Sequence, residues 1–170
     1  MEENLQVIVT KEEIAARVGE LATEIRDAYA GQDLTIVGLL EDSFVFLADL
    51  VRAIDAPLQC CFLKASMHQT GGHTDIIYTT EFDPHGTNIL LLGGVLDTGV
   101  TLDYLERQIT ARGAKSIKAC MLVDKPTFRT TEVTPEFVGF TRTEERIIGY
   151  GLGIGNSFRY LPHLAVVAHT

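Results

Sequence analysis

Three short runs that are predicted to form strands buried on both faces constrain the fold of this chain most. They cover residues 34–40, 88–92 and 116–123 and are rich in apolar residues. A strand with no polar face must be covered on both sides, as the central strands of a parallel sheet are. Helical segments are predicted between these runs, at residues 43–54 and 101–112. The alternation predicts an α/β fold with a twisted, mostly parallel sheet and helices on both faces.

The remaining elements are predicted from local signals. A capping box, in which Thr10 and Glu13 each satisfy a backbone N–H, begins a first helix that Gly31 ends. Further strands are expected near residues 58–65, 75–81, 137–141, 146–151 and 164–168, with a polar loop at 66–74. The 170 residues predict one domain that spans 1–170. Ligands of such sheets bind beyond the carboxyl ends of the strands, so the loops there are where we expect a site.

Composition narrows the partners and the compartment. A formal net charge of −9 disfavours binding to nucleic acid or to anionic membranes. The first residues carry no basic stretch followed by an apolar one, and no apolar run is long enough to span a bilayer. Cys60, Cys61 and Cys120 have no metal-binding spacing, and we expect them to be buried small hydrophobic residues. These features predict a cytoplasmic protein.

The segment from Asn88 to Arg112 is predicted to be a strand, a tight turn and a helix, and it carries the clearest chemistry. The turn holds five residues: Asp97, Thr98, Gly99, Val100 and Thr101. The first N–H groups of a helix lack intrahelical partners and carry partial positive charge, and glycine allows an anion to approach the backbone closely. We therefore predict a phosphate site without a lysine. The alternative is a plain turn in which Thr101 is only the helix N-cap.

At this point the chain resembles a known family. LLLGGVLDTGVTL is similar to the phosphoribosyl-diphosphate signature of the type I phosphoribosyltransferases. From about residue 7 to residue 167 the chain looks like the hypoxanthine-guanine phosphoribosyltransferases, through DLTIVGLLEDSFVFLADLVRAI, ARGAKSIKACMLVDKP, FVGF and IIGYGLGIGNSFRYLPHLAVV. The resemblance implies the type I fold with a small hood. It also implies transfer of the phosphoribosyl group of phosphoribosyl diphosphate to a 6-oxopurine, with magnesium, by a homodimer or homotetramer.

The resemblance assigns roles to particular residues. Asp97 matches the acid that handles the proton at purine N7, and it belongs with Thr98, Gly99, Val100 and Thr101 to the 5′-phosphate loop. The residues matched to purine binding are Lys125, Arg146 and Ile147, and those matched to diphosphate binding are Glu41, Asp42 and Arg159. The expected ligands are therefore a purine base or nucleoside monophosphate and phosphoribosyl diphosphate.

The same alignment shows where the active site diverges. Gly93-Gly94 replaces an acidic pair that holds the ribose hydroxyls, and Gly153 replaces a magnesium-binding aspartate. Glu41-Asp42 replaces Lys-Gly, Arg146 replaces an aromatic residue, and Met67-His68 replaces Ser-Tyr. Two missing carboxylates would remove about 3–6 kcal/mol of ribose and metal binding. Glu41 and Asp42 could return magnesium ligands, or they could simply be an N-cap and a first-turn acid of the next helix.

Three functions remain open from the sequence. The first is a purine phosphoribosyltransferase of weak activity. The second is a catalytically inactive relative that senses a purine mononucleotide or acts as a partner subunit. The third is a related reaction on another phosphorylated substrate, for which Gly93 and Gly94 would make room.

Overall fold

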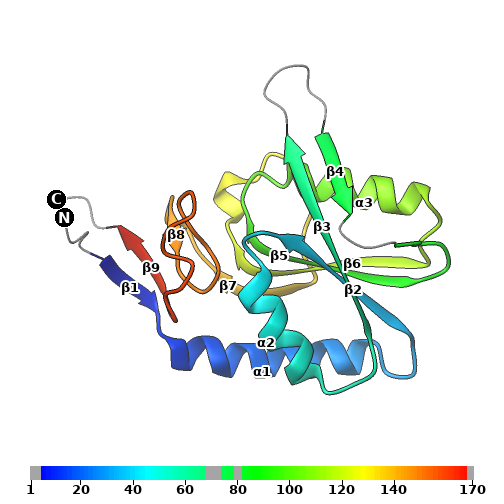
Figure 1. The fold of residues 1–170 in the computed structure, drawn as a ribbon, viewed down its shortest axis with the longest axis horizontal. Helices are drawn as coiled ribbons and strands as arrows, with labels where there is room; N and C mark the ends of the chain where they lie inside the picture. The colour runs from blue at the N-terminus through cyan, green and yellow to red at the C-terminus, as the bar shows by residue number, and fades with distance from the viewer. Residues whose placement is uncertain (1–4, 68–73, 79–81, 168–170) are drawn as a thin grey trace.

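A computed structural model describes residues 5–67, 74–78 and 82–167 (Figure 1). Its helices are α1 (Lys11–Ala28), α2 (Phe44–Ile54) and α3 (Val100–Ala111), with a short 3₁₀ helix at Pro126–Phe128. Its strands are β1 (Leu5–Val9), β2 (Leu34–Leu40), β3 (Gln59–Met67), β4 (Thr74–Tyr78), β5 (Asn88–Leu96), β6 (Ser116–Asp124), β7 (Phe137–Thr141), β8 (Ile147–Ile148) and β9 (Leu164–Val167). No helix within the described residues is long and apolar enough to cross a membrane.

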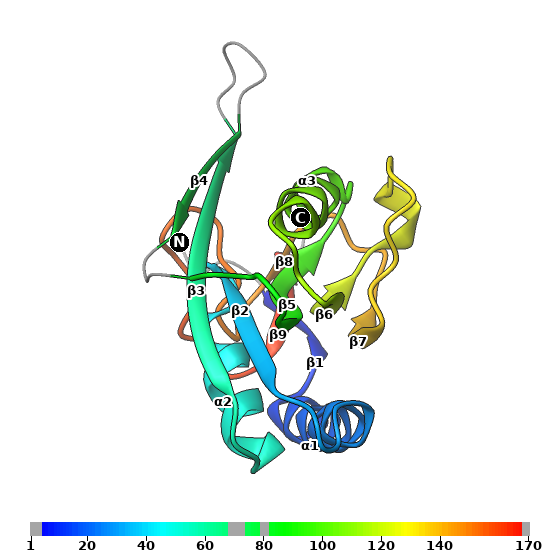
Figure 2. The same ribbon diagram turned by 90° about the vertical axis from the view of Figure 1, so that its right-hand side faces the viewer.

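The main sheet has six strands in the order β4-β3-β2-β5-β6-β7. β3, β2, β5, β6 and β7 are parallel, and β4 pairs with β3 antiparallel at one edge. Helices α1 and α2 lie on one face and α3 on the other, as Figure 2 shows. Alternate side chains of β5 pack on opposite faces of the sheet: Leu90 belongs to the core beneath α1 and α2, whereas Leu91 belongs to the core beneath α3. The predicted fold class is confirmed.

Several predicted boundaries differ from the observed ones. β2 has the predicted bounds, but β5 continues through Gly93 and Gly94 to Leu96 instead of ending at residue 92. α3 begins at Val100 and its N-cap is Gly99, so the alternative in which Thr101 is the N-cap is wrong. The capping box at Thr10 and Glu13 is present as predicted.

A second, three-stranded sheet of order β1-β9-β8 forms the expected hood. β1 was not predicted from the sequence. It pairs antiparallel with β9, so that Leu5 lies opposite Val167 across the two ends of the chain. Among the contacts that attach the hood to the carboxyl ends of the main sheet, Arg159 pairs with Asp42 after β2 and Lys125 after β6 donates to the carbonyl of Glu145. Arg142, after β7, donates to the carbonyl of Ile8 in β1.

The three cysteines do not share one environment. Cys120 is buried in the core and Cys61 is half-buried, but Cys60 is exposed on β3. The expectation that all three are buried is therefore wrong for Cys60. β4 pairs with β3 only from Leu63 to Met67, so at Cys60 the strand has a neighbour on one side alone and is an edge of the sheet.

Candidate active site

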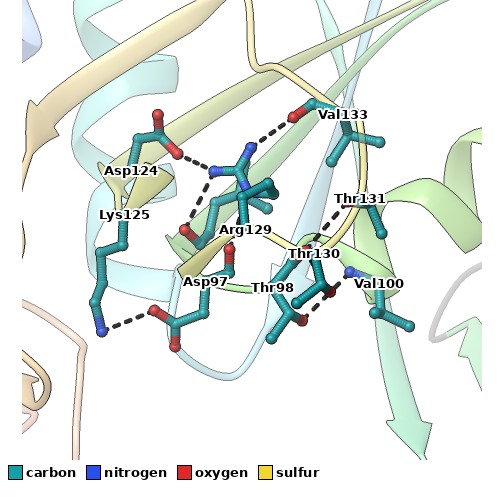
Figure 3. Close-up of polar contacts among 10 residues, drawn as sticks. Asp97, Thr98, Val100, Asp124, Lys125, Arg129, Thr130, Thr131 and Val133 are labelled. Carbon is teal, nitrogen blue, oxygen red and sulfur yellow. Dashed lines mark hydrogen bonds and ion pairs between the residues drawn. The ribbon is translucent and has the colours of Figure 1, made fainter. Parts of the chain in front are cut away.

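The predicted phosphate loop connects the carboxyl end of β5 to α3. Asp97, Thr98 and Val100 are exposed, whereas Gly99 is buried with a φ of +84°. A Cβ atom on Gly99 would lie 2.2 Å from Oγ1 of Thr131, so both the conformation and the space require glycine. Gly99 provides no side-chain cap for α3. Because Thr98 and Val100 are exposed, the beginning of this helix lies at the surface, where the Val100 amide donates to Oγ1 of Thr98 at 3.4 Å (Figure 3).

The carbonyl groups of the same loop are bound from behind by residues that follow β6 (Figure 3). The amide of Lys125 donates to the Leu96 carbonyl at 3.0 Å. Thr130 donates its amide to the Thr98 carbonyl at 2.9 Å. These hydrogen bonds hold the carbonyls of the loop on the side that faces the residues after β6. An anion at the start of α3 would meet N–H groups and the positive end of the helix dipole.

Lys125 joins three parts of the site. Its side chain is 3% exposed, and its Nζ lies 2.8 Å from Oδ1 of Asp97 (Figure 3). The same Nζ donates to the Glu145 carbonyl at 2.8 Å and lies 4.3 Å from the centre of the Phe128 ring. A buried ammonium group needs such partners, because an unpaired charge away from water is very unfavourable. The structure thus brings Asp97 and Lys125 together beside the segment that leads to Ile147.

The other two residues matched to purine binding lie in that segment. Ile147 is the first residue of β8 and is 8% exposed. Arg146 precedes it and is exposed. Since Lys125 holds the carbonyl of Glu145, the backbone of this segment is tied to the carboxyl end of β6. His68, at the position matched to an active-site tyrosine, lies outside the described residues, as does His73.

A pocket of about 220 Å³ adjoins the phosphate loop. Its lining includes Glu41, Asp42, Gly93, Gly94 and Thr101. Glu41 pairs with Lys64 at 2.7 Å, and the hydrogen bond from this lysine holds the pKa of the Glu41 carboxyl below its ordinary value. Asp42 pairs with Arg159. Both carboxylates matched to diphosphate binding therefore face basic side chains of the same chain.

Glu41 and Asp42 do not cap α2. The N-cap is Ser43, whose Oγ donates to the Leu39 carbonyl at 2.7 Å, and the first turn of α2 contains no acidic residue. The alternative in which these two acids are an N-cap and a first-turn acid is therefore wrong. They belong to the turn that connects β2 to α2 at the edge of the pocket.

Neighbouring side chains occupy the space beside two of the glycines that mark the divergence. A Cβ on Gly94 would lie 2.9 Å from Cβ of Asp42. A Cβ on Gly153 would lie 2.9 Å from Cγ of Arg159. The members of the Asp42–Arg159 ion pair thus take up room into which side chains at positions 94 and 153 would project.

The arrangement does not fit a magnesium ion bound directly by protein side chains. Within the described ranges, no group of three or more His, Cys, Asp or Glu residues could hold a metal. Glu41 and Asp42 are ion-paired with Lys64 and Arg159, which compete with any cation.

Arg129 is a residue of the site that sequence reasoning missed. Its side chain is 12% exposed and pairs with Asp124. Its Nε donates to the Asp97 carbonyl at 2.9 Å, and its Nη1 donates to the Val133 carbonyl at 2.5 Å (Figure 3). The available signal was the basic residue in a short loop after a buried strand, only four positions after Lys125.

Comparison with known proteins finds relatives over nearly the whole chain. Residues 6–153 match the model of the phosphoribosyl transferase domain. The chain is 34% identical over 173 residues to the hypoxanthine phosphoribosyltransferase of Salmonella typhimurium, covering 98% of this chain and 97% of that protein. It is 34% identical over 168 residues to the hypoxanthine-guanine phosphoribosyltransferase of Aquifex aeolicus, covering 96% and 94%.

The fold agrees over the same extent. A crystal structure of a hypoxanthine-guanine phosphoribosyltransferase from Bacillus anthracis superimposes with a TM-score of 0.91 at 31% identity, covering 96% of this chain and 98% of that one. The chain therefore belongs to the hypoxanthine-guanine phosphoribosyltransferase family of phosphoribosyl transferases.

Proposed function

We propose that this chain is a purine-salvage enzyme that transfers the phosphoribosyl group of phosphoribosyl diphosphate to hypoxanthine or guanine, releasing diphosphate. The observation that carries the proposal is the open start of α3 at Asp97–Thr101, directly beside the ion pair of Asp97 and Lys125. One end of this site suits a phosphate, and the other offers a carboxylate and an ammonium group. A purine nucleoside monophosphate has a phosphate at one end and, at the other, a base whose ring nitrogens and oxo group can pair with these side chains.

In this proposal each residue of the loop and of the pair has a distinct task. Thr98, Gly99, Val100 and Thr101 bind the 5′-phosphate through amides and hydroxyls. Asp97 accepts the proton of purine N7, which makes the ring nitrogen that attacks the ribose more nucleophilic.

The base would be recognised at the other end of the site. Lys125 donates to the 6-oxo group, and it is already oriented by the carboxylate of Asp97 and the carbonyl of Glu145. The backbone at Ile147 and the side chain of Arg146 complete the purine site. Burial of Lys125 strengthens its hydrogen bond to an oxo group, because little water competes for the ammonium.

Arg159 is the proposed diphosphate-binding cation, and Asp42 partly neutralises it. Its guanidinium also donates to the Gly151 carbonyl at 2.7 Å, so the side chain is held in place. Diphosphate must compete with Asp42 and Glu41 for the Arg159 guanidinium. Each of these carboxylates also repels the diphosphate by a few kcal/mol at an effective dielectric of about 20. We therefore expect phosphoribosyl diphosphate to bind weakly and the Michaelis constant for it to be high.

The test is turnover by the purified chain. Hypoxanthine or guanine is incubated with phosphoribosyl diphosphate and magnesium, and the nucleoside monophosphate is quantified by chromatography. The matched variant Asp97→Asn keeps the size of the side chain but loses the base, and we expect its rate to fall roughly 10²–10⁴-fold. Nucleotide formation no faster than in Asp97→Asn would contradict the proposed activity. If inosine or guanosine monophosphate then still bound, a nucleotide sensor would be the remaining function.

A further inference from the structure

The pocket of about 220 Å³ is placed to receive whatever is attached to a phosphate at the loop. Its lining shares Leu96 and Thr101 with the loop region and continues past Gly94 to Asp42. The sugar of a nucleotide bound by its 5′-phosphate would therefore lie against these residues. Its hydroxyl groups need acceptors, because removing a hydroxyl from water without a partner is unfavourable.

The carboxylate beside the end of β5 comes from Asp42, which follows the neighbouring strand β2, and not from β5 itself. A Cβ on Gly94 would meet Cβ of Asp42 at 2.9 Å, the Asp42 carbonyl oxygen at 3.0 Å and Cδ2 of Leu152 at 2.8 Å. A side chain at position 94 and the side chain of Asp42 thus compete for one space. An acid at either position would serve the same part of the pocket.

Asp42 is held in a defined orientation. Its Oδ1 accepts from Nη1 of Arg159, while the side chain remains 49% exposed. Arg159 is itself fixed by the carbonyls of Gly151 and Gly155, at 2.7 Å and 3.3 Å. A carboxylate has two oxygens and about four acceptor positions, so one pairing leaves capacity for a ligand hydroxyl. Glu41, the other carboxylate of the pocket, is directed to Lys64.

We propose that Asp42 determines sugar specificity: its carboxylate accepts hydrogen bonds from the ribose hydroxyls of the nucleotide and selects ribose over sugars that lack them. The inference rests on the proposed function, because it places the 5′-phosphate at the loop. A carboxylate only accepts hydrogen bonds, so its natural partner here is a donor such as a sugar diol rather than the diphosphate. Asp42 acts here as a binding residue and takes no part in proton transfer.

The test compares guanosine monophosphate with its 2′,3′-dideoxy analogue by calorimetry on each protein. The wild-type chain should prefer guanosine monophosphate by roughly tenfold or more, the value of a hydrogen bond to a charged group. Asp42→Ala and the isosteric Asp42→Asn should lower this preference to roughly threefold or less. The double variant Asp42→Gly with Gly94→Asp removes the Asp42 Cβ and returns a carboxylate beside it. The end of the Leu152 side chain must shift slightly to admit it, and the variant should regain the preference. A ratio measured on one protein is independent of modest changes in its stability.

Asp103→Asn is the matched control, because it removes one carboxylate from α3 outside the pocket lining and should keep the wild-type ratio. An undiminished ratio in both Asp42 variants, or no preference in the wild type, would overturn the inference while leaving the proposed function standing. A double variant that stays unselective would overturn the shared-space argument. Failure of the wild type to bind either nucleotide would overturn the proposed function, and this inference with it.

Discussion

Arg129 connects the back of the phosphate loop to β6 through a nearly buried ion pair with Asp124. Replacing it by methionine leaves Asp124 unpaired at 13% exposure and frees the Asp97 carbonyl. We expect Arg129→Met to lower the free energy of unfolding by about 3–5 kcal/mol, measured by urea denaturation, and to weaken phosphate binding. Arg107→Met is the control, since the Arg107 side chain is 77% exposed and its ion pair with Asp103 should contribute under about 1 kcal/mol. Equal losses in the two variants would contradict this role.

Glu13 gives the chain a pH-dependent contact at the start of α1. Its carboxylate accepts from the Thr10 amide at 2.8 Å and from the Thr10 hydroxyl at 2.9 Å, and these bonds lower the pKa of Glu13 from 4.5. A lowered folded-state pKa stabilises the protein above the unfolded value, and this contribution is lost as pH falls through the folded pKa. The stability difference between wild type and Glu13→Gln should therefore shrink below about pH 4.5 in thermal unfolding curves. A difference that does not change between pH 7 and pH 3 would refute this assignment.

The turn between β5 and α3 depends on a single residue, Gly99. Gly99→Ala must accommodate a Cβ at 2.2 Å from Thr131 Oγ1 and at 2.7 Å from Arg129 Cδ, in addition to a positive φ. We expect a loss of about 2–4 kcal/mol in the free energy of unfolding and a clear loss of inorganic phosphate binding. Gly31→Ala is matched, because it also has a positive φ (+72°) but no atom within 4 Å of its Cβ.

The comparison separates conformational cost from crowding. Gly31→Ala should lose only about 1 kcal/mol, the cost of the left-handed conformation, and should keep phosphate affinity. If both variants lose the same stability and phosphate binding is unchanged in Gly99→Ala, the close contact between the loop and residues 129–133 does not shape the site.

The reactivity of the cysteines measures how often the whole molecule unfolds. Cys60 is exposed, whereas Cys120 is fully buried, and burial raises the pKa of its thiol well above the ordinary value. A thiol reagent should modify Cys60 in the native protein, because the side chain is exposed; partial burial raises the pKa of this thiol and slows the reaction without preventing it. Cys120 should react only at the rate of global unfolding, and urea should accelerate it. Mass spectrometry of timed samples measures both rates, and rapid native labelling of Cys120 would contradict the packing of this core.

Local sequence was sufficient to predict structure wherever the residues that interact are close together in the chain. The bounds of β2 follow from an uninterrupted apolar run, and the start of α1 follows from a box that spans residues 10–13. The loop at Asp97–Thr101 was also recognisable, because a strand end, a glycine and a helix start lie within a few residues. The assigned roles of the site residues stay predictions.

Tertiary structure alone decided the features whose partners are remote in the chain. β1 carries little apolar periodicity of its own and is a strand because it pairs with β9, more than 150 residues away. Arg129 belongs to the site because the chain after β6 folds behind the loop that ends β5. A side chain at position 94 would meet the side chain of Asp42 only because β2 and β5 are adjacent in the sheet. Sequence determines which local conformations are favourable, but which side chains compete for one space depends on how the strands are ordered.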